Sequence, residues 1–220
     1  MLKTIPLVIL LFCTSAFGQE KTAANNCRIR PGTLCAEMNL NGIDLQGVDL
    51  ARSQFSRSKL VGANFQRANL TEANMQLSDL RRANFSNAIL SGADFRTANL
   101  VDAKFHGANL KDANLEDALM GGADFTRADL SGVDLSAGEL AGVKFEEAKL
   151  QRANFSDANL RDAVFTGANL TGANFSNATL TGADLTGAIL DQAIFDAADM
   201  GGCKGCPAPR ARQPVRSGNR

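Results

Sequence analysis

Residues 63–72 read ANFQRANLTE, two copies of a five-residue unit with a large apolar residue at the centre and a small residue two positions earlier. Every fifth residue from Leu40 to Met200 is Leu, Phe or Met, thirty-three in a row. A period of five matches neither the 3.6-residue helix nor the two-residue strand, so neither element alone can bury the pattern. The chain must turn a corner every five residues, which predicts a solenoid of stacked repeats.

The charge is unevenly distributed along the 220 residues, although the formal net charge is zero. Residues 36–200 contain 14 Lys and Arg against 22 Asp and Glu, whereas the segment after Met200 contains five basic residues and no acid. This composition indicates an acidic rod followed by a basic tail. An acidic rod without Trp or Tyr is a poor nucleic-acid binder, because phosphate contacts need basic side chains and stacking needs exposed rings.

Residues 1–18 are typical of a secretory signal peptide, with a basic residue followed by an apolar stretch too short to span a bilayer. Small residues favour cleavage after Gly18, with Ala16 as the alternative. Cys13 suggests a lipid anchor as another reading, but the preceding Phe12 is bulky for that signal. We therefore expect an exported chain without a stable membrane anchor, in the periplasm or secreted, or in the thylakoid lumen of a photosynthetic source.

Four cysteines remain after the signal peptide, and all lie outside the repeats: Cys27, Cys35, Cys203 and Cys206. An even number in an exported chain favours disulfides. Three pairings are possible, and the distance between the ends of a rod favours Cys27–Cys35 with Cys203–Cys206. A redox dithiol at Cys203 and Cys206 and a metal or free-thiol role are the alternatives, although no βαβ unit surrounds the C-x-x-C motif.

The repeat has a consistent composition around its large apolar position, here called position i. Position i−2 is most often Ala, position i−1 is most often Asp or Asn, and positions i+1 and i+2 are polar, charged or Gly. Gly at i+2, as in Gly62 and Gly92, suits a corner with positive φ. This pattern resembles that of the pentapeptide-repeat family, commonly summarised as A-(D/N)-L-x-x, over about three quarters of the chain.

The resemblance implies an all-β fold, a right-handed quadrilateral β-helix with four repeats in each twenty-residue coil. Positions i and i−2 would point inward, and positions i−1, i+1 and i+2 outward. The repeats then form about eight coils and a rod on the order of 40 Å long. The expected organisation is a signal peptide at 1–18, an N-terminal segment and disulfide cap at 19–37, the β-helix at 38–200, and a disordered Arg- and Pro-rich tail at 201–220.

The large residues give an independent indication of the twenty-residue coil. Those at positions ending in 5 are mostly Phe, and those at positions ending in 0 are never Phe. On a four-sided coil this alternation puts Phe on two opposite faces and Leu on the other two, with rings in stacking range. The expected core columns are Phe65, Phe85, Phe105, Phe125, Phe145 and Phe165, and Leu70, Leu90, Leu110 and Leu130.

Few residues suggest catalysis or ligand binding. His106, the single histidine, occupies an outward i+1 position. The Asx series is expected to form local turns, with its members apart from one another on a convex surface, rather than to bind calcium; it includes Asp94, Asn99, Asn109 and Asn114. The sequence has no Gly-rich phosphate loop between a strand and a helix. We therefore expect no enzymatic activity, no cofactor and no metal.

The sequence favours a rigid, exported rod that binds an unknown protein partner. The family resemblance implies an alternative, because some relatives mimic DNA and protect gyrase from quinolones. Arginines such as Arg81 and Arg82 interrupt the acidic surface, and an exported chain does not meet gyrase. A redox module based on Cys203 and Cys206 is the second alternative. The exposed ladder edges at the rod's ends also suggest an end-to-end homodimer.

Overall fold

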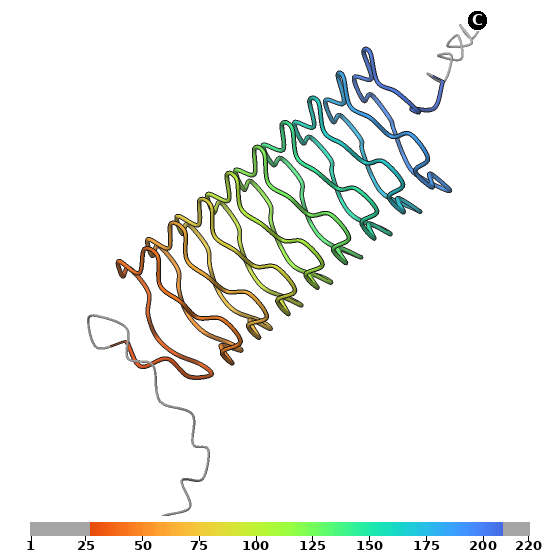
Figure 1. Ribbon diagram of the computed structural model, residues 1–220. Coiled ribbons are helices and arrows are strands. Elements are labelled where there is room, and N and C mark those ends of the chain that lie inside the picture. The colour runs from red at the N-terminus through yellow and green to blue at the C-terminus, as the bar shows by residue number, and fades with distance from the viewer. Residues whose placement is uncertain (1–26, 209–220) are drawn as a thin grey trace, which may run out of the picture.

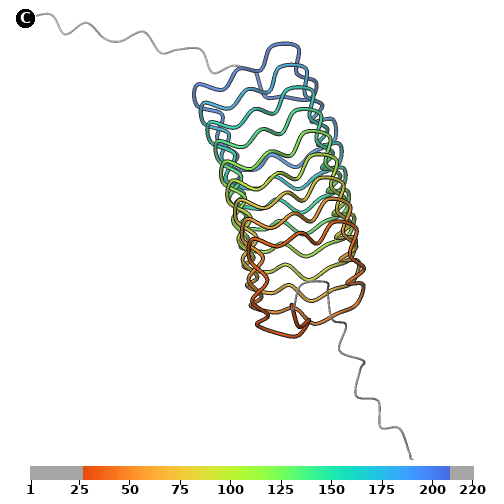
Figure 2. The same ribbon diagram turned by 90° about the vertical axis from the view of Figure 1, so that its left-hand side faces the viewer.

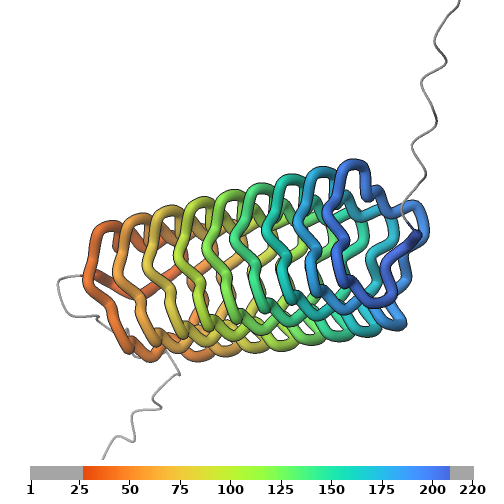
Figure 3. The backbone as a smooth tube through the Cα atoms, turned by 90° about the horizontal axis from the view of Figure 1, so that it is seen from above, coloured from red at the N-terminus to blue at the C-terminus, as the bar shows by residue number. Residues whose placement is uncertain are grey.

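The computed structural model describes residues 27–208 and shows a straight rod of stacked coils (Figure 1, Figure 2). Parallel β-bridges join each bridge residue to the residue twenty positions later, from Leu34–Gln54 through to Asp184–Lys204. Within the described range there is no helix, and every bridge is a single residue between two-residue turns. One coil is therefore twenty residues with four corners, which Figure 3 shows as a stack of similar loops.

Each flat segment between two corners alternates inward and outward side chains. Leu77, Asp79 and Arg81 point outward, whereas Ser78 and Leu80 are buried in the lumen. This is the two-residue period of an extended strand, interrupted at each corner before it can continue. Each five-residue repeat of the sequence therefore consists of a three-residue extended segment and a two-residue turn.

Backbone hydrogen bonds hold each coil to both neighbours. The N–H of Leu80 donates to the carbonyl of Asn99 at 2.7 Å, and the N–H of Asp79 donates to the carbonyl of Ser58 at 2.9 Å. Each turn is closed within its own coil, as where the N–H of Ala83 donates to the carbonyl of Leu80 at 3.0 Å. The backbone of an interior coil is thus paired without any helix or long strand.

Every corner has a residue with positive φ at position i+2, from Gly32 to Gly202. The glycines expected there occupy only fourteen of these corners, and the other twenty-one carry a side chain. A residue with a Cβ is less stable in the left-handed region by about 1–2 kcal/mol. The corner tolerates this strain because its N–H is bonded to the next coil, as from Arg82 to the carbonyl of Val101 at 3.0 Å.

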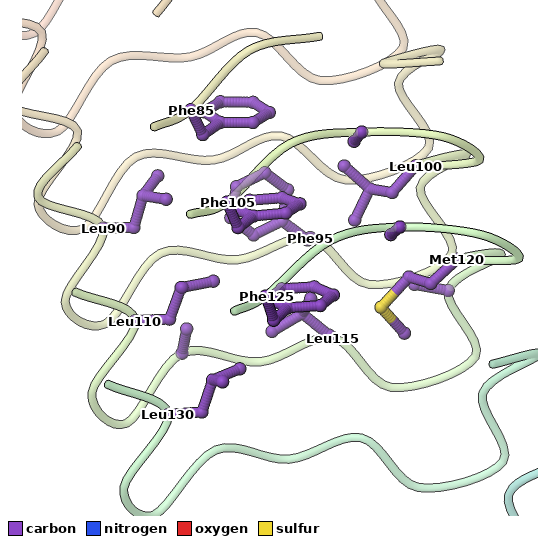
Figure 4. Packing of buried hydrophobic residues seen from close by; sticks show 14 of the residues in the cluster. Phe85, Leu90, Phe95, Leu100, Phe105, Leu110, Leu115, Met120, Phe125 and Leu130 are labelled. Atoms are coloured by element: carbon purple, nitrogen blue, oxygen red, sulfur yellow. The ribbon is translucent and has the colours of Figure 1, made fainter. Parts of the chain in front are cut away.

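Phenylalanine rings fill the lumen in two columns, of which one is a continuous stack that includes Phe85, Phe105 and Phe125 (Figure 4). The expected column from Phe65 to Phe165 has successive ring centroids 4.5–5.2 Å apart and interplanar angles of 2–19°. The second column meets the first edge-on, as between Phe85 and Phe95 at 5.7 Å and 87°. The expected Leu column that includes Leu90, Leu110 and Leu130 is fully buried beside the rings.

The ladder is longer than the interval 38–200 expected from the sequence. The bridges between described residues run from Leu34 to Lys204, beyond that interval at both ends. The reason at the first boundary is that Cys35, which is fully buried, takes the inward position that Leu or Phe occupies elsewhere. The proposed signal peptide, residues 19–26 and residues 209–220 lie outside the described residues.

We expect Ala103→Leu to lower the free energy of unfolding by roughly 1–3 kcal/mol, because a larger side chain overpacks a filled lumen. Ala103 is fully buried next to the Phe105 stack. Urea unfolding measures the change. Lys104→Leu is the matched control on the neighbouring outward position, where the effect should stay within about 0.5 kcal/mol. Equal stability of the Ala103 variant and the parent would contradict the inward assignment.

Candidate functional site

The rod presents four outward faces, each made of rows of three residues. A row is centred on a bridge residue n and includes residues n−2 and n+2, and successive rows follow twenty residues apart. We name the faces by their bridge columns. Face I runs from Asn39 to Asp199, face II from Asp44 to Lys204, face III from Asp49 to Ile189, and face IV from Leu34 to Ile194. A binding site on the convex sides of the rod must be built from these rows.

The Asx residues singled out in the sequence form turns. The Oδ1 atoms of Asp94, Asn99, Asn109 and Asn114 each accept the N–H of the residue two positions later, at 2.9–3.3 Å. Asx side chains favour this local bond, and it fixes the start of each corner. The expectation that these groups lie apart was wrong, because the coil stacks them in columns; Asp94, for example, is bridged to Asn114.

Several outward carboxylates have lowered pKa values because they accept hydrogen bonds at these corners. The bond from the Arg81 guanidinium to Asp79, at 2.6 Å, lowers the pKa of Asp79. Burial opposes ionisation of Asp129, but bonds from Ser131 and the charges of Lys111 and Lys149 together lower its pKa. These carboxylates act as structural acceptors that stabilise the corners in their ionised form.

The remaining sequence candidates do not form a convergent constellation. His106 is exposed on face II. Cys27 and Cys35 form a disulfide with a Cα–Cα distance of 5.5 Å, and Cys203 and Cys206 form another at 5.8 Å, at opposite ends of the rod. In residues 27–208, no group of three or more His, Cys, Asp or Glu side chains is arranged to hold a metal ion. No helix in that range is long and apolar enough to cross a membrane.

The C-terminal end of the rod is open. A hollow of ≈ 790 Å³ is lined by the apolar Leu190, Phe195 and Met200, by the polar Gln192 and Asp196, and by Pro207 after the disulfide. The backbone N–H groups of Leu190, Phe195 and Met200 have no hydrogen-bond acceptor among the described residues, because the next coil is missing. This end of the described rod therefore combines a hollow with unpaired backbone donors.

Face I differs in chemistry from the other three faces. At its n+2 positions five residues lack a polar side chain, whereas the other faces together have only Ala36, Ala51 and the disulfide-bonded Cys206 there. These five are Val61, Val101, Gly121, Ala141 and Gly201. The n−2 positions of face I contain no glycine. Three of them carry an apolar side chain, which no n−2 position of the other faces does: Leu77, Ala137 and Ala197.

The charge of the rod also changes along its axis. Residues 52–104 contain eight Lys and Arg against four Asp and Glu, whereas residues 105–200 contain six against fifteen. Because each coil advances the chain along the axis, these intervals are successive lengths of the rod. The sequence average of an acidic rod therefore hides a basic length followed by an acidic one. Both this polarity and the chemistry of face I appear only when residues twenty apart are compared.

The family model described as pentapeptide repeats matches residues 38–76, 78–117, 108–146, 139–177 and 168–204. The chain belongs to the pentapeptide-repeat family. No curated protein matches it. Pentapeptide-repeat proteins are generally structural or protein-binding molecules, in keeping with the rod described above.

Several solved structures are similar to this chain, and three of them illustrate the likeness. HetL, involved in heterocyst differentiation regulation in the cyanobacterium Nostoc, is 29% identical over 77% of this chain and 88% of its own, with a TM-score of 0.49. A pentapeptide repeat protein of the Arabidopsis thaliana thylakoid lumen is 36% identical over 45% of this chain and 69% of its own, with a TM-score of 0.44. Trypsin-treated QnrB1, a plasmid-mediated fluoroquinolone resistance protein, is 22% identical over 80% of this chain and 90% of its own, with a TM-score of 0.43.

We expect the rod to lose stability in acid. The pKa values of Asp79, Asp94, Asp124 and Asp129 are lowered in the fold, so their contribution is complete above the unfolded pKa of about 4 and is lost as the pH falls through the folded values. Urea midpoints at neutral pH and near pH 3 measure the loss. Asp79→Asn keeps the turn acceptor and should reduce the pH dependence; an unchanged dependence contradicts the role of this carboxylate.

Proposed function

We propose that this pentapeptide-repeat protein is exported and acts, without enzymatic activity, as a rigid scaffold that binds a protein partner through its outward rows. The observation that carries the proposal is the separation of roles within the repeat. Inward positions are almost uniform, whereas face I has its own apolar and charged residues. The right-handed coil of about eight turns implied by the repeat would hold these residues at fixed spacing.

Rigidity supports binding because an ordered surface loses little entropy on association. Between Leu34 and Lys204 each coil is bonded to its neighbours, and the Phe stacks run through several coils. The outward side chains are thus held on a stiff support. Export rests on the signal-like residues 1–18, and disulfides at both ends of the rod are in keeping with an oxidising compartment.

A topoisomerase modulator that mimics DNA is the alternative, and the charge distribution disfavours it. A duplex mimic needs negative charge along its length, whereas residues 52–104 carry an excess of basic groups.

A redox module is favoured by one observation, the Cys203–Cys206 disulfide at the open end of the rod. Thiol titration decides it: two thiols that appear on mild reduction and reoxidise reversibly would support it, and a bond that resists mild reduction would oppose it.

We expect the full-length chain, expressed in its source, to be recovered from the exporting compartment with a new N-terminus after Gly18 or Ala16. Fractionation and mass spectrometry of the intact chain measure this. Pull-down from that compartment with the folded rod then identifies the partner, and a scrambled outward surface on the same lumen is the control. An uncleaved chain in the cytoplasm contradicts export, and inhibition of gyrase supercoiling by the pure rod would then favour the DNA mimic.

We also propose that the open C-terminal end can pair with a second copy. The N–H groups of Leu190 and Phe195 and the carbonyl groups of Ala188 and Ala193 have no partner in the described residues. Strands carrying both unpaired donors and acceptors can pair in the antiparallel direction across a two-fold axis. Light scattering at high protein concentration should show a dimer, and a strict monomer would exclude this mode of association.

A further inference from the structure

We propose that residues 214–219 of this chain dock on its own open C-terminal end as a partial further layer of the rod. The docked segment covers the edge that pairing with a second copy requires, so docking and end pairing compete. The competition rests on the end pairing proposed above, whereas the docking itself does not. Three observations support the docking: an uncovered edge, the place where the described chain ends, and side chains that match the last coil at an offset of twenty residues.

The last ring of the second Phe column has no layer over it. Phe155, Phe175 and Phe195 stack with successive ring centroids 4.9 Å apart. The first two rings are fully buried, whereas Phe195 is only partly buried and lines the terminal hollow. The N–H of Phe175 donates to the carbonyl of Ile194 at 2.7 Å, but the N–H of Phe195 has no acceptor among the described residues. The edge therefore offers an apolar ring and a free backbone donor at one position.

Pro207 prevents the coil from continuing as a regular ladder. It follows Gly187 by twenty residues, and Gly187 forms its corner at a φ of 70°. Proline cannot adopt that conformation, because its ring holds φ near −65°. The positive φ occurs instead at Gly205, where a Cβ would lie 2.7 Å from the carbonyl carbon of Leu185, so the chain turns early and close against the last coil. Pro207 and Ala208 then line the hollow, and the described chain ends there, beside the uncovered edge.

Side chains twenty residues apart contact each other along the rod. Arg127 pairs with Glu147 at 2.8 Å, and the Nδ2 of Asn154 donates to the Oδ1 of Asp134 at 3.1 Å. The same two kinds of pair recur in other coils, as Arg52–Glu72 and Asp49–Asn69. A further layer on the last coil therefore needs a base over an acid, an amide over an aspartate and an apolar residue over the last ring.

Residues 214–219 contain these three partners in the required positions. The pairs at an offset of twenty residues are Phe195–Val215, Asp196–Arg216 and Asp199–Asn219. Val215 would cover the exposed ring, and the two polar pairs would repeat the ion pair and the amide bond of earlier coils. Asp196 is exposed on the rim of the hollow and has no ion-pair partner among the described residues.

Opposite charges draw the same two segments together. Residues 181–200 contain four acidic side chains and no basic one, whereas residues 209–220 contain four arginines and no acid. Charge attraction alone gives no register, but only Arg216 of the four follows an acidic residue by twenty positions. By the same offset Arg210 would point into the apolar lumen, so we assign residues 209–213 to the connection and not to the layer.

Pro214 makes the docking reversible. In the described coils a bridge residue both donates and accepts a ladder bond, as Ile194 does. Pro214, twenty residues later, can accept the N–H of Phe195 but has no N–H to donate to the carbonyl of Ala193. One of the two ladder bonds at this position is therefore missing. A layer held by half of its ladder, one apolar contact and two exposed polar pairs can leave the edge when a second copy competes for it.

Amide hydrogen exchange of Phe195, followed by NMR in the complete chain, tests the docking. In dilute protein its N–H should exchange at least about tenfold more slowly than in the Val215→Asp variant, because a carboxylate is not stable against an apolar ring. Arg216→Glu should speed exchange about fivefold, and Asp196→Arg combined with it should restore the parent rate to within about twofold. Equal rates in the parent and the Val215→Asp variant overturn the docking.

Arg212→Glu is the matched control for the register. It makes the same change of charge as Arg216→Glu in the same segment, but the residue twenty positions earlier is Gln192. The Phe195 exchange rate should therefore stay at the parent value. A loss of protection equal to that of Arg216→Glu would show attraction without register and overturn the assignment of residues 214–219.

Dependence on protein concentration separates docking from end pairing. Docking within one chain should give the same Phe195 exchange rate at about 10 μM and at about 100 μM, because it is unimolecular. Protection that appears only as the concentration rises would assign the edge to a second copy and overturn the docking.

The competition is measured by analytical ultracentrifugation. Both ends must be uncovered in a two-fold pair, so tenfold protection of each end predicts a dimer about a hundredfold tighter in Val215→Asp than in the parent. Arg212→Glu should dimerise like the parent. Equal dimerisation of Val215→Asp and the parent overturns the competition. Absence of dimers in every variant at about 1 mM overturns both end pairing and competition, while the exchange rates still decide the docking.

Discussion

The hydrogen-bonded match between residues twenty positions apart is the constraint on which the rest of the structure depends. It lines up the inward side chains, so Phe65 stacks on Phe85 at 4.9 Å instead of packing at an arbitrary angle. It also fixes the corners, because the N–H of each i+2 residue is bonded to the neighbouring coil. The backbone can therefore hold twenty-one residues with side chains in a conformation they ordinarily avoid. Packing and corner strain are both consequences of one ladder.

The same ladder separates what builds the rod from what distinguishes its faces. A residue such as Ala103 or Phe105 is constrained by the lumen, whereas Val101 on the neighbouring corner faces solvent. Outward residues twenty apart become neighbours on one surface, so each face has a composition of its own. In a family whose members share their inward pattern, recognition has to reside in these outward columns. Face I is the clearest example in this chain, because its n−2 and n+2 columns differ from those of every other face.

The repeat made the fold and much of the core predictable from sequence, because the strict five-residue register leaves few ways to bury Leu and Phe. The Asx turns were predictable for the same local reason. The ends of the ladder were not predictable from the repeat, because Cys35 takes an inward position without matching the repeat and Lys204 forms a bridge beyond Met200. The special chemistry of face I was also missed. It appears only when Leu77, Asn99 and Leu119 are placed on one surface, and five-residue composition averages over all four faces.

The four-corner coil has a consequence for how such a chain can change length. Insertion of twenty residues adds a layer and leaves every downstream side chain on its original face, so Glu139 stays in the column of Lys59. Insertion of five residues keeps the register of large inward residues, but it rotates everything downstream by a quarter turn and moves Phe onto the Leu columns. The acidic rows would then move round to an adjacent side of the rod. A duplication that keeps the five-residue register can thus dismantle a surface, and selection on that surface would favour insertions of twenty residues.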